Sequence, residues 1–137
     1  MYEESFIHYK IHIEIRDAEH KILFDTMQSI IDMIRLGETS EVKETLQRFI
    51  RLGNEHFASE EAFMESINYP YLNVHKSIHN SLRVGVEVLA ARFENDYIFN
   101  EYYRTSLINT LRDFDKRMAN HVDEDDRQYA EFYLKNK

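Results

Sequence analysis

The chain has 137 residues, which fits one domain built around a single hydrophobic core. It contains no cysteine, which excludes disulfides, iron–sulfur clusters and thiolate metal sites, so any metal must be held by imidazole and carboxylate groups. The net charge of −8 and the lack of a basic run argue against nucleic acid or an anionic membrane as a partner.

Three glycines and one proline are too few for the many turns of a β-rich fold, and helical periodicity instead predicts an all-α protein. The N-terminal segment lacks this periodicity, because Ile11, Ile13 and Ile15 alternate with polar residues. We therefore divide the chain into an extended N-terminal arm, residues 1–16, and a single four-helix bundle domain, residues 17–137.

Four amphipathic segments follow the arm. The first is predicted to begin at Asp17 as N-cap and to stop at Gly37, and the second to run from about Ser40 to the break at 68–70. Their predicted inward residues are Leu23, Phe24, Met27, Ile30, Ile31 and Ile34, then Val42, Leu46, Phe49, Gly53, His56, Glu60, Phe63 and Ile67.

The third helix is predicted to run from Leu72 to about Asn95, and the fourth to begin near Tyr103. Their predicted inward residues are Leu72, His75, His79, Leu82, Val86, Leu89 and Phe93, then Tyr103, Leu107, Leu111, Phe114, Met118 and His121. Long helices with short connections predict an up-down-up-down bundle.

Several polar residues occupy inward helix positions where a core leucine or phenylalanine would be expected. Others fall at the same height along the bundle axis as these residues. The candidates for a metal site are His20, His56, Glu60, His75, His79, His121 and Asp126. They converge because the starts of odd helices meet the ends of even helices in an antiparallel bundle. A buried carboxylate such as Glu60 needs a neutralising partner, which a metal supplies. The alternative is a metal-free bundle whose buried polar groups each find a hydrogen-bond partner.

The spacing within the helices supports a shared site, except for the pair His121 and Asp126. Two i,i+4 pairs share a helix face, namely His56 with Glu60 and His75 with His79. His121 and Asp126 are five residues apart, so both can face the core only if the helix bends or loosens between them. By periodicity alone Asp125 is the better inward residue, and residues 123–126 could instead form a solvated acidic face.

Four segments, residues 17–24, 56–64, 69–79 and 121–129, resemble the successive signatures of the hemerythrin family, particularly its bacterial single-domain members. The resemblance covers the chain from Asp17 to Tyr133. It implies a non-haem di-iron centre that binds dioxygen reversibly, with an oxo or hydroxo bridge between the irons. It also implies that one iron is held by His75, His79 and His121 and the other by His20 and His56, with Glu60 and Asp126 as bridges. The family pattern thus chooses Asp126 over Asp125.

Coordination chemistry adds to this interpretation. Five imidazoles, two bridging carboxylates and one shared oxygen leave a single open position on two six-coordinate ions. An open position in an apolar cage suits a small neutral ligand. The spacing does not distinguish iron from manganese, zinc or cobalt.

Three features depart from the family pattern or fall outside it. The family usually has Trp-Leu before the last histidine, whereas this chain has Arg117-Met118. We expect Arg117 to reach the surface; if it turned inward, it would wet the ligand pocket and favour autoxidation. Glu19 replaces the commoner glutamine beside His20. The arm residues His8 and His12 are expected to have solvent or structural roles.

Aromatic residues are expected mainly to pack. The tyrosines considered are Tyr9, Tyr69, Tyr71, Tyr102, Tyr103 and Tyr129, and one of them in the pocket could shift the chemistry toward oxidase or peroxide activity. The phenylalanines expected in the core, some as walls of the ligand pocket, are Phe24, Phe57, Phe63, Phe93 and Phe114.

We therefore expect a dioxygen carrier, store or delivery protein rather than an enzyme. The alternatives are an oxygen or redox sensor, or an enzyme that reacts with nitric oxide or peroxide. A ferritin-like site is disfavoured because no histidine follows a glutamate by three residues, and the HExxH zinc motif is absent. We expect a monomer or weak oligomer, with a separate protein partner if it acts as a sensor. With no signal-peptide or membrane-spanning stretch, we expect a cytoplasmic protein.

Overall fold

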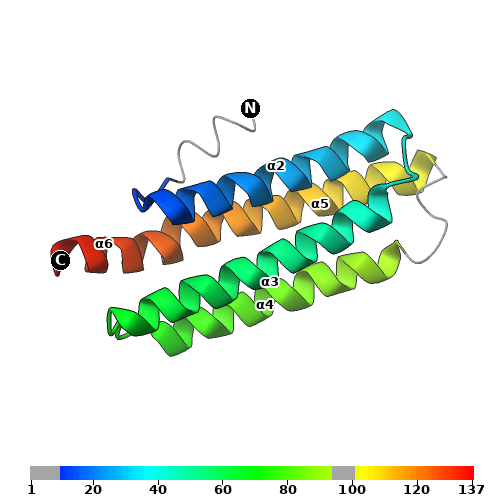
Figure 1. Ribbon diagram of the computed structural model, residues 1–137. Coiled ribbons are helices and arrows are strands. Elements are labelled where there is room, and N and C mark those ends of the chain that lie inside the picture. The colour runs from blue at the N-terminus through cyan, green and yellow to red at the C-terminus, as the bar shows by residue number, and fades with distance from the viewer. Residues whose placement is uncertain (1–9, 94–100) are drawn as a thin grey trace.

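The computed structural model describes residues 10–93 and 101–137 of the chain. The elements are α2 (Glu14–Leu36), α3 (Val42–Ser66), α4 (Leu72–Arg92), α5 (Glu101–His121), the π-helical turn η2 (Val122–Asp126) and α6 (Arg127–Lys135). The segments α5, η2 and α6 continue one another as a single long rod (Figure 1), so the chain forms an antiparallel four-helix bundle. This confirms the all-α fold predicted from periodicity.

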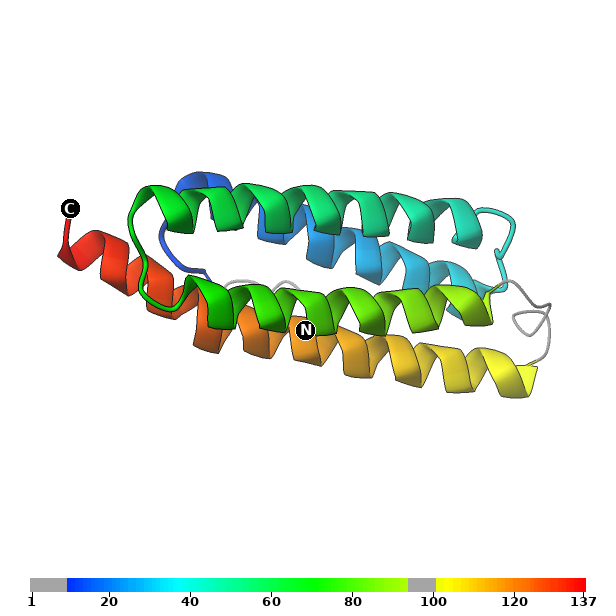
Figure 2. The same cartoon turned by 90° about the horizontal axis from the view of Figure 1, so that it is seen from below.

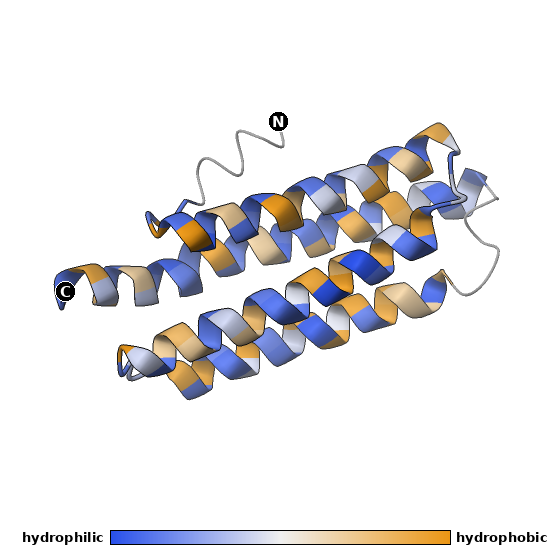
Figure 3. Cartoon of the chain, in the orientation of Figure 1, coloured by the Kyte–Doolittle hydropathy of each residue, from blue (hydrophilic) through white to orange (hydrophobic). Residues whose placement is uncertain are grey.

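The four rods surround one core. Helix α2 packs against α3 and α5, and α4 packs against the same two. Figure 2 shows the helices running side by side along the bundle. The core residues with the least exposed side chains include Met27, Ile30, Ile34, Val42, Met64, Leu107 and Leu111. Figure 3 shows hydrophobic and hydrophilic residues interspersed along every helix, as amphipathic helices require. None of the described helices is long and apolar enough to cross a membrane.

Helix α2 ends where the sequence predicts. Gly37 takes a left-handed conformation with φ of 76°, and its N–H donates to the carbonyl of Ile34 while the N–H of Glu38 donates to that of Met33. Glycine adopts this conformation without the steric cost that a Cβ atom would add. The stop signal at Gly37 is therefore confirmed.

The start of α2 differs from the prediction. The helix begins at Glu14 with Ile13 as N-cap, so residues 14–16 of the predicted extended arm are helical. Asp17 is not the N-cap: its carboxylate accepts the backbone N–H groups of Ile11 (2.9 Å) and His12 (3.2 Å), which anchors the incoming segment one turn further along the helix. Residues 1–9 of the arm lie outside the described part.

Some residues predicted to face inward are less buried than expected. Tyr103, predicted to face inward, is 40% exposed because it lies at the outer end of α5 beyond the packed core. Phe63 is only partly buried, and Met64 takes the fully buried position beside it. The predicted end of the third helix at Asn95 lies outside the described residues, and α4 is described to Arg92.

Candidate metal centre

All seven candidate residues lie together at one end of the bundle. His20 comes from α2, His56 and Glu60 from α3, His75 and His79 from α4, His121 from the end of α5, and Asp126 from η2. Every one of these side chains is buried, and Glu60, His79 and Asp126 have no exposed surface. Four rods therefore place five imidazoles and two carboxylates in one closed space.

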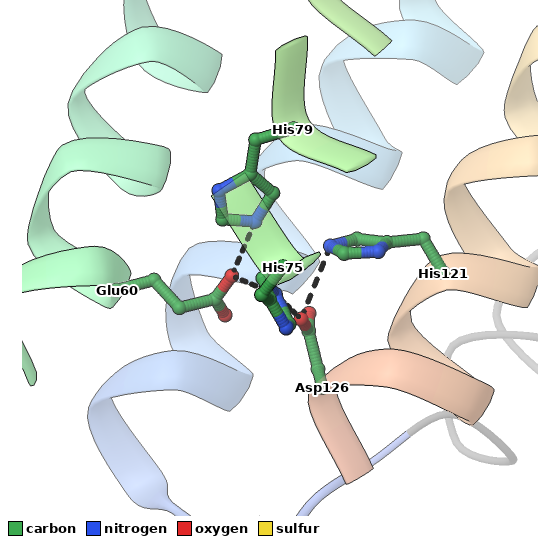
Figure 4. A group of neighbouring side chains, drawn as sticks. All are labelled: Glu60, His75, His79, His121 and Asp126. Atoms are coloured by element: carbon green, nitrogen blue, oxygen red, sulfur yellow. Dashed lines mark hydrogen bonds and ion pairs between the residues drawn. The ribbon is translucent and has the colours of Figure 1, made fainter. Parts of the chain in front are cut away.

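The seven residues fall into two overlapping groups. One group contains Glu60, His75, His79, His121 and Asp126, and the other contains His20, His56, Glu60 and Asp126. Within each group the nearest ligating atoms all lie within 4.8 Å of one another. Figure 4 shows the first group, with the imidazoles and carboxylates pointing toward one centre. The two carboxylates belong to both groups.

The oxygens of Glu60 are divided between the groups. Its Oε1 lies 2.9 Å from His79 Nε2 and 3.3 Å from His75 Nε2. Its Oε2 lies 3.5 Å from His56 Nε2 and 3.8 Å from His20 Nε2. One carboxylate oxygen thus faces each set of histidines.

Asp126 is divided in the same way. Its Oδ1 lies 2.8 Å from His75 Nε2 and 3.1 Å from His121 Nε2. Its Oδ2 lies 3.1 Å from His20 Nε2. Two carboxylates that each present one oxygen to either side have the arrangement needed to bridge two neighbouring cations.

Unpaired polar atoms provide a test of whether these residues fit a metal. Both ring nitrogens of His20, Nε2 of His75 and of His121, and both oxygens of Asp126 are buried without a hydrogen-bond partner among the described residues. Apart from His20 Nδ1, these atoms lie between 2.8 and 3.1 Å from an atom of the opposite kind, nitrogen from carboxylate oxygen. Buried polar atoms without partners cost free energy, and cations between them would satisfy all but the outer nitrogen of His20. The donor set therefore fits two metal ions.

Carboxylates outside the cluster orient three of the imidazoles. The Nδ1 of His56 donates to Glu19 at 2.8 Å, that of His79 to Glu61 at 2.7 Å, and that of His121 to Asp125 at 3.0 Å. With the proton held on Nδ1, the Nε2 lone pair points to the centre, as a metal ligand requires. The role of Glu61 was not predicted from the sequence, although its place directly after Glu60 in α3 was a usable signal.

Arg16 supports one of these carboxylates. Its Nη1 lies 2.8 Å from both Glu19 Oε1 and Ser59 Oγ, and the residue is 6% exposed. Glu19 therefore accepts hydrogen bonds from His56 and from a buried guanidinium at the same oxygen. The replacement of glutamine by Glu19 is matched by this cation.

The π-helical turn settles which aspartate faces inward. Between His121 and Asp126 the helix widens, so both side chains enter the core although five residues separate them. This confirms that the helix loosens there. Asp125 lies at the edge of the cluster against His121 Nδ1, while Asp123 and Glu124 are exposed. The acidic run is solvated only in part.

Tyr129, expected from the sequence mainly to pack, is a residue of the site. Its side chain is fully buried and its O–H donates to Glu60 Oε2 at 2.8 Å. Burial and the charges of Glu60 and Asp126 raise the pKa of Tyr129 far above its usual value, so it remains a hydrogen-bond donor. Its position one helical turn after Asp126 was the available signal.

Without metal, three of the imidazoles and the two carboxylates shift one another's pKa values. Burial lowers the pKa values of His20 and His75, but Asp126 and Glu60 more than offset this and raise both to about 9. Burial also lowers the pKa of His121, but the charges of Asp126 and Glu60 and the hydrogen bonds to Asp125 and Asp126 together raise it to about 10. Burial raises the pKa values of Glu60 and Asp126, but the surrounding histidines hold both below their usual range. Metal ions would replace these protons.

An apolar cavity of about 40 Å³ adjoins the cluster. It reaches His20, His56, His121 and Asp126, and its other walls are largely apolar. The apolar and aromatic residues lining it are Leu23, Phe24, Phe49, Ile50, Phe57, Leu82, Val86, Phe114, Met118 and Val122. This volume exceeds the roughly 10–15 Å³ that one water molecule needs, so a diatomic molecule fits.

The two residues of the Arg117-Met118 pair lie on different sides of α5, one at the surface and one at the cavity. Arg117 is exposed and donates to Ser81 Oγ at 3.2 Å, so the prediction that it reaches the surface is confirmed and the inward alternative is wrong. Met118 lines the cavity. Phe63 and Phe93 do not line it, and neither does any tyrosine among the described residues.

The arm histidines have no part in the described cluster. His12 is exposed and belongs to neither ligand group. His8 lies outside the described residues.

Comparison with known proteins gives one family. The model of the hemerythrin HHE cation binding domain matches residues 12–133. A bacteriohemerythrin of Campylobacter jejuni is 34% identical over 99 residues, covering 69% of this chain and 72% of the relative. A bacteriohemerythrin of Stenotrophomonas maltophilia is 26% identical over 88% of this chain and 74% of the relative, and a myohemerythrin of Theromyzon tessulatum is 33% identical over 58% of each. No solved structure gives a significant match.

Proposed function

The chain belongs to the hemerythrin family, and from this membership and the geometry of the site we propose that it holds two iron ions and binds dioxygen reversibly. The observation that carries the proposal is the position of the apolar cavity. It touches both histidines of the two-histidine group, His20 and His56, but only His121 of the three histidines in the other group. The side of the centre with fewer protein ligands is therefore the side with room for a small molecule.

The proposed ligands follow the two groups. His75, His79 and His121 would hold one iron, His20 and His56 the other, and Glu60 and Asp126 would bridge the pair, with an oxo or hydroxo group as third bridge. The division of each carboxylate's oxygens between the groups supports the bridging role. When bound, the irons would supply the open coordination position and the electrons that dioxygen accepts.

The chain's own residues would orient the ligands and keep the site dry. Glu19, Glu61 and Asp125 hold three imidazoles in one tautomer, and Tyr129 fixes Glu60 through its O–H. The cavity walls leave almost no polar surface beside the two-histidine group. A neutral diatomic molecule can occupy such a space without losing hydrogen bonds to water.

The cavity favours binding over the alternative of a nitric-oxide or peroxide enzyme. Arg117 lies on the surface, and no tyrosine among the described residues lines the cavity. The only described cation at the cavity is Arg83, at its rim. The cavity thus offers no acid beside the bound molecule apart from the ligand residues themselves.

Iron content and absorption spectra test this proposal. We expect about two irons per chain, and charge-transfer bands that appear when the reduced protein meets dioxygen and disappear when dioxygen is removed. Immediate oxidation that cannot be reversed by removing dioxygen would instead favour the reductase or sensor function. Absence of iron from protein purified and reconstituted with Fe²⁺ would contradict the proposal.

A further inference from the structure

The three glycines of the chain differ in whether backbone conformation or neighbouring atoms would oppose a side chain at that position. Gly37 has a positive φ, and at Gly85 a Cβ atom would lie 2.9 Å from Arg117 and 3.3 Å from Phe114, so both have a structural reason. Gly53 lies inside α3, and a Cβ there would meet nothing within 4 Å. Glycine in a helix interior is about 1 kcal/mol less favourable than alanine. Neither backbone nor packing explains Gly53, whereas the open space beside it does.

That open space belongs to the cavity next to the proposed iron centre. Gly53 is one of the lining residues, and most of the others are buried. The lining residues that reach the surface are Ile50, Gly53, Asn54 and Phe57 on α3 and Arg83 on α4. The cavity therefore comes closest to solvent between α3 and α4, two helices that lie side by side in Figures 1 and 2.

A hydrogen-bonded bridge spans the two helices at this rim. Arg83 Nε donates to Asn54 Oδ1 at 3.1 Å, and Arg83 Nη1 donates to Asn80 Oδ1 at 2.6 Å. The guanidinium also lies over the ring of Phe57, 5.3 Å from its centroid. These contacts hold Asn54, Phe57 and Arg83 in place at the rim. Gly53 has no side chain, so it leaves a gap between them.

We infer that Gly53 forms the access window through which a small apolar molecule enters the cavity from the gap between α3 and α4. For dioxygen as the molecule, the inference rests on the proposed function. A side chain at position 53 raises the barrier to passage in both directions, so association and dissociation slow together while the equilibrium affinity stays close to that of the native chain.

The test compares Gly53→Leu with the matched control Ala58→Leu, which adds a similar side chain at an exposed position of α3 that does not line the cavity. Stopped-flow mixing of the reduced, iron-loaded proteins with dioxygen measures association, and mixing with an oxygen scavenger measures dissociation. We expect both rates to fall at least about tenfold in Gly53→Leu, equivalent to a barrier about 1.4 kcal/mol higher. Ala58→Leu should keep native rates. Gly53→Ala, which favours the helix, should show a smaller slowing and serves if the leucine variant does not fold.

Exchange of xenon between water and the cavity, followed by ¹²⁹Xe NMR, tests the window without any iron chemistry. If the native protein fails to bind dioxygen, the proposed function fails, while slower xenon exchange in Gly53→Leu still supports the window. Native rates for both gases in Gly53→Leu and Gly53→Ala would overturn the inference. So would a weaker affinity with an unchanged association rate, because the added side chain would then fill the binding space rather than the passage.

Discussion

At the scale of single residues, Glu60 connects the two histidine groups with each other and with Tyr129. Its two oxygens face different histidine groups, and Tyr129 donates to one of them. It has no exposed surface, so its charge can be stable only among the imidazoles or metal ions that surround it. Loss of this carboxylate should therefore affect both the metal content and the fold.

We predict that Glu60→Ala reduces iron to one or fewer ions per chain and lowers the free energy of unfolding by about 3 kcal/mol, because histidines around it lose a buried partner. Iron analysis and chemical denaturation measure the two effects. His12→Ala is the control for iron content and should leave it unchanged, since His12 is exposed and outside both ligand groups. Full iron content in Glu60→Ala would contradict the bridging assignment.

Tyr129→Phe isolates one hydrogen bond, because the ring that packs against Phe63 and His75 is kept. A hydrogen bond to a charged group contributes about 1.5–3 kcal/mol, and we expect a loss of stability in that range. Iron should also bind about tenfold more weakly in competition with a chelator. Tyr71→Phe, at a side chain that is 61% exposed, is the matched control. Equal chelator release from both variants would show that the phenol does not support Glu60.

At the scale of the elements, the π-helical turn is the feature that the site depends on most. A regular α-helix would turn Asp126 away from His121 and bring Asp125 toward the core. The wider turn of η2 instead buries Asp126 and leaves Asp125 to hold the outer nitrogen of His121. Such local widening often accompanies functional sites.

This difference predicts unequal effects for two neighbouring aspartates. Asp126→Asn should remove at least one iron, because the neutral amide cannot replace a bridging carboxylate. Asp125→Asn should keep two irons and weaken their binding by about tenfold, since it changes only the support of His121. Iron stoichiometry after dialysis distinguishes them, and the reverse order would mean that Asp125 is the inward ligand.

At the scale of the whole molecule, the centre joins all four rods, so the protonation or metal content of one cluster affects the stability of the entire bundle. Without metal, His20, His75 and His121 have folded-state pKa values of about 9, 9 and 10, above the ordinary value of 6.5. A raised pKa means that the folded state binds protons more tightly than the unfolded state. This stabilisation is complete below pH 6.5 and is lost as the pH rises through 9 to 10.

We therefore predict that the melting temperature of the metal-free chain falls between pH 7 and pH 10. The iron-loaded protein should show the opposite linkage on acidification, because metal binding requires deprotonated imidazoles and acid releases the metal. Differential scanning calorimetry of protein with and without iron, over the same buffers, measures both trends. A metal-free melting temperature that rises with pH over this range would contradict the network of charges.

The sequence by itself determined the bundle and the level at which its polar residues meet. Helical periodicity is a local property, and the i,i+4 spacing of His56 with Glu60 places both side chains on one face whatever the rest of the chain does. The order of helix starts and ends then brings distant histidines to the same end. The five-residue separation of His121 and Asp126 required a looser helix only if both residues faced the core, and the family resemblance, not periodicity, chose Asp126 over Asp125.

The tertiary structure alone decided how these groups meet. Which oxygen of Glu60 faces which histidine, the hydrogen bond from Tyr129, the support by Glu61 and the cavity that opens beside Gly53 all depend on the rotation and spacing of separate rods. These quantities are set by packing between residues as far apart as 69 positions, as for Tyr129 and Glu60, and no local pattern encodes them. The early start of α2 was missed for a different, local reason: Asp17 accepts the backbone N–H groups of the preceding segment instead of capping its own helix.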